Sequence, residues 1–310
     1  MKIFNIRFLS ISLISIILII FFLFLVSHTK YDDNIIIQNR ESIVGDYSIT
    51  ALPLPDTLTF AGESVPLDKY YMRESYDREL LVNTYWQSNT LLLLKRANRY
   101  FPVIEPILKE QGVPDDFKYL AVIESGLMER IVSPAGAVGI WQFLSGTAKD
   151  YGLEVNKEVD ERYHLEKSTV AACKFLKRSF EIYDSWAMAA ASYNAGVRGM
   201  NRQIDIQKND NYYELLLNEE TARYVYRALA LKEIMTQPEK YGFKLTPEDF
   251  YYPVKTFDVI ISGKVENFAD FASEYNITYR ELKDQNPWLR ETFLENRNKK
   301  EYTIKIPIFR

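Results

Sequence analysis

The sequence predicts a mainly α-helical protein that ends in a small α+β module. Two observations favour this fold class. Over residues 69 to 235, apolar residues recur at the three- and four-residue spacing of helices, and Gly112, Gly152 and Gly196 supply stops. From Tyr251 onward, short β-branched runs flank helical stretches instead. We therefore expect one all-helical domain followed by one βααβ unit.

The helical region begins with leucine-rich patterns that run from Lys69 to Gln111 and stop at Gly112. Pro114 then opens a new helix, because proline suits the first turn and the aspartates that follow complement the helix dipole. Further helices are predicted over residues 145–151, 166–183, 185–194 and 219–235.

The C-terminal segment, residues 251–310, predicts two strands with two helices between them. Val254 and residues 259–261 form the first apolar run, and the alternation over residues 302–306 forms the second. Helical stretches cover residues 267–274 and 278–284. We expect this module to be separable from the helical domain.

The N-terminal segment, residues 1–27, predicts a membrane anchor or a signal segment. Residues 8 to 26 form a nineteen-residue apolar run interrupted by three serines, close to the ~20 residues that span a bilayer. Lys2 and Arg7 precede the run, so the remainder of the chain should be exported. A cleaved signal peptide is the alternative, but residues 26–28 make a poor cleavage site. Residues 28–68, which contain Pro53 and Pro55, predict a linker.

Composition excludes some function classes. The net charge is −4, from 42 acidic and 38 basic residues, which argues against a nucleic-acid partner. The lone Cys173 lies on the apolar side of its helix and should be core. His28 and His164 have no cysteine partners at ligand spacing, so we expect no metal site.

Three short motifs carry the chemistry: Glu124-Ser125, then residues 139–142 (GIWQ), then residues 193–196 (YNAG). Together with residues 133–138 (SPAGAV) and 220–225 (ETARYV), they make the stretch from Phe101 to Lys232 resemble the catalytic domain of lytic murein transglycosylases, relatives of goose-type lysozyme. The D-type membrane-bound branch is the most similar. That branch often carries a lipidated cysteine, but Cys173 lies far inside the chain, which removes lipid anchoring.

The resemblance implies a lysozyme-like all-helical fold over residues 69–245, with its core at 101–232. Residues 251–310 resemble a LysM peptidoglycan-binding module in segments such as 275–277 (YNI) and 304–307 (IKIP). The usual Gly-Asp-Thr-Leu opening is replaced by residues 262–265 (SGKV), and the stretch from Pro287 to Tyr302 is long.

Glu124 is the candidate catalytic acid. It follows the apolar residues 120–123, and an apolar wall disfavours the charged carboxylate and raises its pKa toward working pH. A surface glutamate at a helix end is the alternative reading of an isolated Glu-Ser pair.

The resemblance also implies roles for five other residues. Ser133 and Gln142 would hydrogen-bond the sugar at the scissile bond, Tyr193 would orient Glu124, Asn194 would brace that loop and Tyr224 would line the cleft. Each has a structural alternative: Ser133 as a turn former, Gln142 as a surface amide and Tyr193 as core. Trp141 is either packing or a platform for a sugar ring.

Most glycoside hydrolases use two carboxylates, but no second acid falls within the three short motifs; Glu129 and Asp150 are the nearest. A lone acid suits a lytic transglycosylase, which by resemblance cleaves between N-acetylmuramic acid and N-acetylglucosamine without water or cofactor. The sequence therefore predicts an enzyme of the bacterial cell envelope, anchored in the membrane, that acts on peptidoglycan strands in the periplasm. A goose-type lysozyme hydrolase and a non-catalytic cell-wall scaffold are the alternatives.

Overall fold

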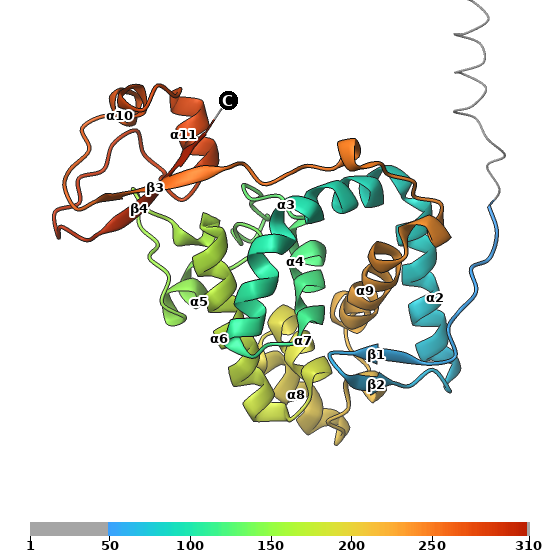
Figure 1. Cartoon of the computed structure of the whole chain (residues 1–310). Coiled ribbons are helices and arrows are strands. Elements are labelled where there is room, and N and C mark those ends of the chain that lie inside the picture. The colour runs from blue at the N-terminus through green and yellow to red at the C-terminus, as the bar shows by residue number, and fades with distance from the viewer. Residues whose placement is uncertain (1–48, 309–310) are drawn as a thin grey trace, which may run out of the picture. The chain divides into compact units, whose positions relative to one another are not determined.

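The computed structural model describes residues 49–308 (Figure 1). The predicted anchor at residues 1–27 and residues 28–48 of the predicted linker lie outside these residues. Between residues 49 and 308, no helix is both long enough and apolar enough to cross a membrane.

A β-hairpin begins the described fold. Strand β1 (Leu58–Phe60) pairs antiparallel with β2 (Glu63–Val65), and both turn residues, Ala61 and Gly62, have positive φ. The sequence placed this stretch in a linker, but Phe60 and Val65 are buried in the core. The Glu63 carboxylate accepts hydrogen bonds from the first backbone N–H groups of a later helix, where the helix dipole favours negative charge.

Two long helices follow. The predicted helical region 69–111 is confirmed, except that it is divided at Trp86 into α2 (Tyr70–Tyr85) and α3 (Gln87–Gln111). Trp86 has a φ of −87° and a ψ of 58°, so the backbone leaves the helical conformation at this residue. Gly112, at a φ of 68°, ends α3 as predicted.

The remaining helices of the domain are α4 (Lys118–Ser125), α5 (Ser145–Asp150), α6 (Leu165–Tyr183), α7 (Trp186–Ala195), α8 (Val197–Gln207) and α9 (Glu219–Thr236). The Asn218 side chain caps α9 by accepting the Thr221 N–H. Helix α8 was not predicted, although Val197, Met200 and Ile204 have helical spacing.

The core lies among these helices. Helix α2 packs along α9, and α6 packs along both α7 and α3. The largest side chains with almost no exposure include Trp141, Tyr76 and Tyr224, and Cys173 is buried as predicted. The mainly α fold class is therefore confirmed.

The C-terminal module has the predicted βααβ order: β3 (Thr256–Ile261), α10 (Phe268–Glu274), α11 (Tyr279–Gln285) and β4 (Tyr302–Pro307). The two strands pair antiparallel, with Val259 opposite Ile304. Thr278 and Glu281 form a reciprocal capping box at the start of α11.

The core of this module includes side chains from the helical domain. Val138, Val159 and Tyr163 belong to the same buried apolar cluster as Leu289 and Ile304 of the module. A strand-like bridge pairs Val159 with Leu289. The module therefore differs from the expected separable unit, because part of its core comes from another part of the chain.

Candidate active site

Glu124 lies at the end of a short helix that fixes its position. It is the penultimate residue of α4, and Gly126, at a φ of 59°, ends the helix in the left-handed conformation. The Ser125 hydroxyl donates to the Ala121 carbonyl and accepts the Leu127 N–H. Ser125 is buried, so the serine of the Glu-Ser motif shapes the helix end while its neighbour faces the cleft.

All six residues predicted for the site line one cleft of about 550 Å³. They come from four parts of the fold: the end of α4, the loop between α4 and α5, the end of α7, and α9. The six are Glu124, Ser133, Gln142, Tyr193, Asn194 and Tyr224.

The environment of Glu124 leaves its carboxyl group partly protonated near neutral pH. Burial raises the pKa of Glu124 to about 7, although the Tyr224 hydroxyl and the Arg227 guanidinium favour the charged form. The Tyr224 hydroxyl donates to Glu124 Oε1 at 2.5 Å. A carboxyl group with a pKa near 7 can both give and take a proton at working pH.

Tyr193 does not orient Glu124 directly, which differs from the predicted role. Its hydroxyl donates to the Trp141 carbonyl oxygen at 2.8 Å, and its ring packs against Phe143 and Phe175. Tyr193 therefore holds the loop that carries Gln142, and Tyr224 is the tyrosine that contacts the carboxyl group of Glu124.

Ser133 and Gln142 lie on one tightly hydrogen-bonded loop. The Ser133 hydroxyl oxygen accepts the Ala137 N–H at 3.0 Å, and the Gln142 side-chain amide donates to the Gly139 carbonyl at 2.8 Å. Gln142 has a φ of 49°, a conformation that is uncommon for residues other than glycine. The Ser133 hydroxyl proton and the Gln142 amide oxygen stay available to a ligand in the cleft, since no bond within residues 49–308 uses them.

Trp141 is a packing residue. Its side chain is 0% exposed, and its indole N–H donates to the Thr169 hydroxyl at 2.9 Å. A sugar platform needs an accessible ring face, so this alternative is excluded by the burial of Trp141.

Asn194 joins the end of α7 to the start of α9. Its amide nitrogen donates to Glu220 Oε1 at 2.9 Å, and its oxygen accepts the Thr221 hydroxyl at 2.8 Å. Asn194 therefore sets the spacing between the helix that carries Tyr193 and the helix that carries Tyr224.

Glu220 and Arg227 line the same cleft and were missed as site residues. Glu220 raises the pKa of Glu124 and Arg227 lowers it, both as smaller effects than burial. Glu220 lies in the segment 220–225 that carries the resemblance. No local signal in the sequence, however, indicates that this glutamate lies near Glu124, nearly one hundred positions earlier.

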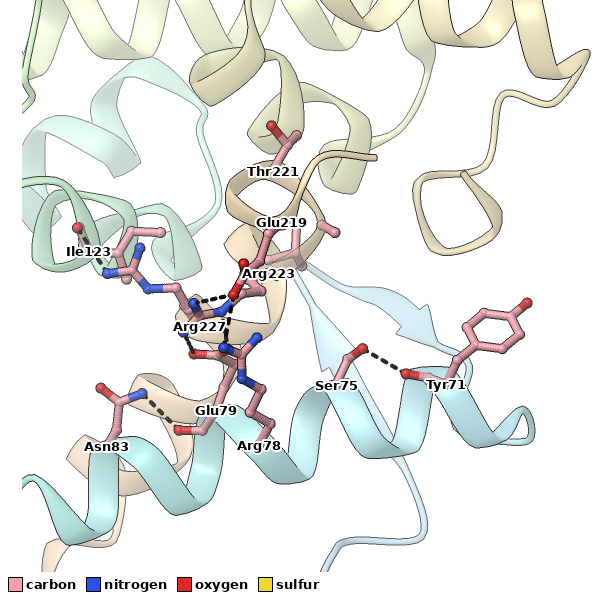
Figure 2. Close-up of polar contacts among 12 residues, drawn as sticks. Tyr71, Ser75, Arg78, Glu79, Asn83, Ile123, Glu219, Thr221, Arg223 and Arg227 are labelled. Atoms are coloured by element: carbon pink, nitrogen blue, oxygen red, sulfur yellow. Dashed lines mark hydrogen bonds and ion pairs between the residues drawn. The ribbon is translucent and has the colours of Figure 1, made fainter. Parts of the chain in front are cut away.

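Helix α9 is held in place by a buried ion pair next to Tyr224. Both Glu79 oxygens accept from the Arg223 guanidinium, at 2.6 and 3.2 Å, and Glu79 is 1% exposed (Figure 2). Arg227, one turn further along α9, donates to the Ile123 carbonyl beside Glu124 (Figure 2). Helix α2 thus positions the face of α9 that borders the cleft.

Glu129 and Asp150, the two other acids nearest to the short motifs, do not line the cleft that contains Glu124. Asp150 is exposed at the end of α5. Glu129 lines a different hollow, also of about 550 Å³, where burial raises its pKa while a hydrogen bond from Tyr100 opposes that rise. Neither borders the cleft that contains Glu124. Within residues 49–308, no group of three or more His, Cys, Asp or Glu side chains is arranged to hold a metal ion.

Two segments of the chain match known protein families. Residues 101–216 match the family described as the Transglycosylase SLT domain. This part of the chain is therefore similar to SLT transglycosylase domains. Residues 257–309 match the soluble lytic transglycosylase C-terminal LysM-like domain.

Two similar proteins have the name of a lytic murein transglycosylase. Membrane-bound lytic murein transglycosylase D of Escherichia coli strain K12 is 28% identical over 212 residues, covering 66% of this chain. The same values hold for the protein of that name from E. coli O6:H1. The chain spans 46% of the length of these relatives. A solved structure of an inactive mutant of lytic transglycosylase Slt from Pseudomonas aeruginosa has 17% identity and a TM-score of 0.36, covering 50% of this chain and 26% of that chain.

Three cleft residues lie beyond the matched SLT segment, which ends at residue 216. Glu220, Tyr224 and Arg227 all belong to α9. The cleft therefore includes α9, which lies beyond the matched segment, and Glu79 of α2 holds α9 in place.

Proposed function

We propose that this protein is a peptidoglycan lytic transglycosylase. One observation carries the proposal: a single partly buried carboxyl group, Glu124, with a pKa of about 7, is held by Tyr224 in the cleft of an SLT domain. The name of the E. coli relatives, lytic murein transglycosylase, supports the same substrate.

In the first step, protonated Glu124 gives its proton to the oxygen of the β-1,4 bond between N-acetylmuramic acid and N-acetylglucosamine. The bond from C1 to that oxygen breaks, and positive charge develops at C1. Glu124 becomes a carboxylate, which the Tyr224 hydroxyl stabilises because a hydrogen bond to the charged form favours it.

In the second step, the 6-hydroxyl of the same muramic residue attacks C1. Its proton passes to the Glu124 carboxylate, which restores the acid. The product is a 1,6-anhydro sugar, and no water is consumed. The attacking group is already tethered to the reacting sugar, so the step gains from a high effective concentration.

Ser133 and Gln142 are proposed to bind the sugar next to the scissile bond. The Ser133 hydroxyl supplies a donor and the Gln142 amide oxygen an acceptor, both from a loop held by Tyr193. Asn194 braces Glu220 and the start of α9.

We also propose that the enzyme acts in the cell envelope, with residues 8–26 as its membrane anchor and the catalytic domain on the periplasmic side. The apolar length of that run and the name of the relatives support this location.

A goose-type hydrolase is the alternative with a specific observation behind it, because Glu220 is a second carboxylate in the cleft. Its Oε1 already accepts the Asn194 amide, so that oxygen has a structural partner. A non-catalytic scaffold has no such support, since a scaffold needs no carboxyl group with a raised pKa.

Mass spectrometry of products from purified murein sacculi tests the proposal. We expect muropeptides with 1,6-anhydro ends, each lighter by one water than the corresponding lysozyme product, and none from Glu124→Gln. Products with reducing ends would assign the protein to the hydrolases. Absence of any product from the wild type would favour the scaffold.

A further inference from the structure

The C-terminal module contacts the segment of the helical domain that supports the cleft loop. We propose that this module is a positioning element for the loop 131–143, which carries Ser133 and Gln142, and that it acts through residues 158–163. The expected change in kcat rests on the proposed function, whereas the expected change in hydrogen exchange at the loop does not.

The first step is the contact between the module and residues 158–160. The Asp160 N–H donates to the Trp288 carbonyl at 2.9 Å, and the Arg290 N–H donates to the Glu158 carbonyl at 2.7 Å. These bonds flank the bridge between Val159 and Leu289. Val159 is 1% exposed, so the contact is an apolar core with backbone pairing along it.

Charged side chains surround this contact. Lys305 forms an ion pair with Glu166, and Arg130 donates to Asp284 at 2.9 Å. Burial opposes the charge on Glu166, but its bonds to His164 and Lys305 prevail and lower its pKa to about 2. The ion pair with Lys305 therefore persists across the physiological pH range.

The second step leads from residues 158–163 to the cleft loop. Arg162 pairs with the Asp160 carboxylate through Nε at 2.9 Å and Nη2 at 2.7 Å. Its remaining nitrogen, Nη1, donates to the carbonyls of Gly136 and Phe143, each at 3.1 Å. One buried arginine thus ties two points of the loop 131–143 to the segment that the module contacts.

The loop also touches this segment directly. A Cβ atom on Gly139 would lie 2.2 Å from the Arg162 carbonyl oxygen, so the two backbones are in close contact. Val138, which pairs with Val132 and Phe143 inside the loop, is itself part of the module's apolar cluster. The module therefore contacts the loop both through Arg162 and through Val138.

The long stretch from Pro287 to Tyr302 gains a role in this arrangement. It supplies Trp288, Leu289 and Arg290 to the backbone pairing, and Lys300 and Tyr302 to the Glu154 carboxylate. A module that only tethered the enzyme to the polymer would need a flexible linker and no such contact.

The test uses the full-length chain and reverses two interface charges. Arg130→Glu with Lys305→Glu places carboxylates against Asp284 and Glu166 and should release the module. Further substitution with Asp284→Arg and Glu166→Lys exchanges both pairs and should restore docking. Lys299→Glu, on an exposed turn of the module, is the control for changed charge.

Hydrogen exchange is the first readout, and it does not depend on activity. The Asp160 amide reports docking, because its partner is the Trp288 carbonyl; the Ala137 and Val138 amides report the loop. In the charge-reversed variant we expect faster hydrogen exchange at all three amides. In the variant with both charge pairs swapped, and in Lys299→Glu, we expect the hydrogen exchange of the wild type. If docking survives the reversal, Val159→Asp places a carboxylate in the shared core and serves as the second variant.

The second readout is kcat on short soluble glycan chains, which need no retention on the polymer. We expect kcat to fall by about tenfold, with KM changed far less, because a misplaced binding loop costs rate. The inference would be overturned if the Asp160 amide exchanges fast while the exchange of the loop amides and the kcat of the enzyme both stay unchanged. Reducing-end products from the wild type would overturn the proposed function alone, since the exchange result stands independently.

Discussion

The Tyr224 hydroxyl donates a 2.5 Å hydrogen bond to Glu124 Oε1, although the two residues lie 100 positions apart in the sequence. The bond joins the end of α4 to the middle of α9. It stabilises the carboxylate form of a group whose burial favours the neutral form. The balance between these two effects leaves the pKa of Glu124 at about 7, where one group can act as acid and then as base.

Glu124→Gln should change how stability depends on pH. The folded-state pKa is raised from 4.5 to about 7, so the native state binds more protons than the unfolded state in this range. Wild-type stability should therefore fall as pH rises from 4.5 to about 7, by up to about 3 kcal/mol from this group. The glutamine variant lacks this fall. Denaturant unfolding at a series of pH values measures the difference, and parallel curves would show that Glu124 titrates normally.

Tyr224→Phe should lower kcat and move the alkaline limb of the activity profile to higher pH. Loss of the hydrogen bond removes an effect that lowers the pKa of Glu124, so the acid stays protonated to higher pH. A hydrogen bond to a charged group contributes about 1.5–3 kcal/mol, which corresponds to a loss of roughly ten- to hundredfold.

The matched control is Tyr213→Phe. The Tyr213 hydroxyl is buried and has no hydrogen-bond partner among the described residues, so its loss should leave kcat and the pH profile unchanged. A Tyr224→Phe profile that shifts toward lower pH would contradict the assignment.

Glu220→Gln should shift the alkaline limb in the opposite direction. The Glu220 carboxylate raises the pKa of Glu124 by charge repulsion, and removing its charge lowers that pKa. The substituted amide oxygen can still accept the Asn194 donor, so the cleft geometry should persist. Because Glu220 is exposed, salt should reduce the shift.

Glu219→Gln tests whether any loss of charge in the first turn of α9 has the same effect. Glu219 pairs with Arg78 and Arg223 and does not line the cleft that contains Glu124. We expect an unshifted profile. Loss of all anhydro product in Glu220→Gln, with Glu219→Gln active, would instead assign Glu220 a direct catalytic role.

Glu79→Gln should destabilise the fold by about 3 kcal/mol, because it breaks a buried ion pair and leaves Arg223 without its main partner. Arg78→Gln breaks an exposed pair with Glu219 and should cost far less, because solvent screens that pair. Figure 2 shows both ion pairs. Thermal unfolding compares the two variants, and equal losses would show that the buried pair does not hold α9.

The sequence was sufficient for the site residues that lie next to local signals. Glu124 follows an apolar run and precedes Gly126, so its place at a helix end is set within a few residues. Gln142 and Tyr193 are found by motif spacing, and the structure places both at the same cleft. The βααβ order follows from strand alternation and the capping residue Thr278.

Long-range relationships could not be predicted in this way. Glu63 stabilises the hairpin by accepting from the start of α7, more than one hundred residues later. Glu79 and Glu220 act through partners on other helices. The pairing of Val159 with Leu289 has no local signal at all. The hydroxyl contact of Tyr193 differs from the expected one for a similar reason, since motif spacing does not say which tyrosine hydroxyl reaches the carboxyl group.

The most direct test of the central claim is digestion of sacculi in water enriched in a heavy oxygen isotope. If Glu124 alone acts as acid and base and the muramic 6-hydroxyl is the nucleophile, the 1,6-anhydro products carry no heavy oxygen. Incorporation of one heavy oxygen at C1 of the released muramic ends would contradict the claim, because it would show that water attacks the sugar.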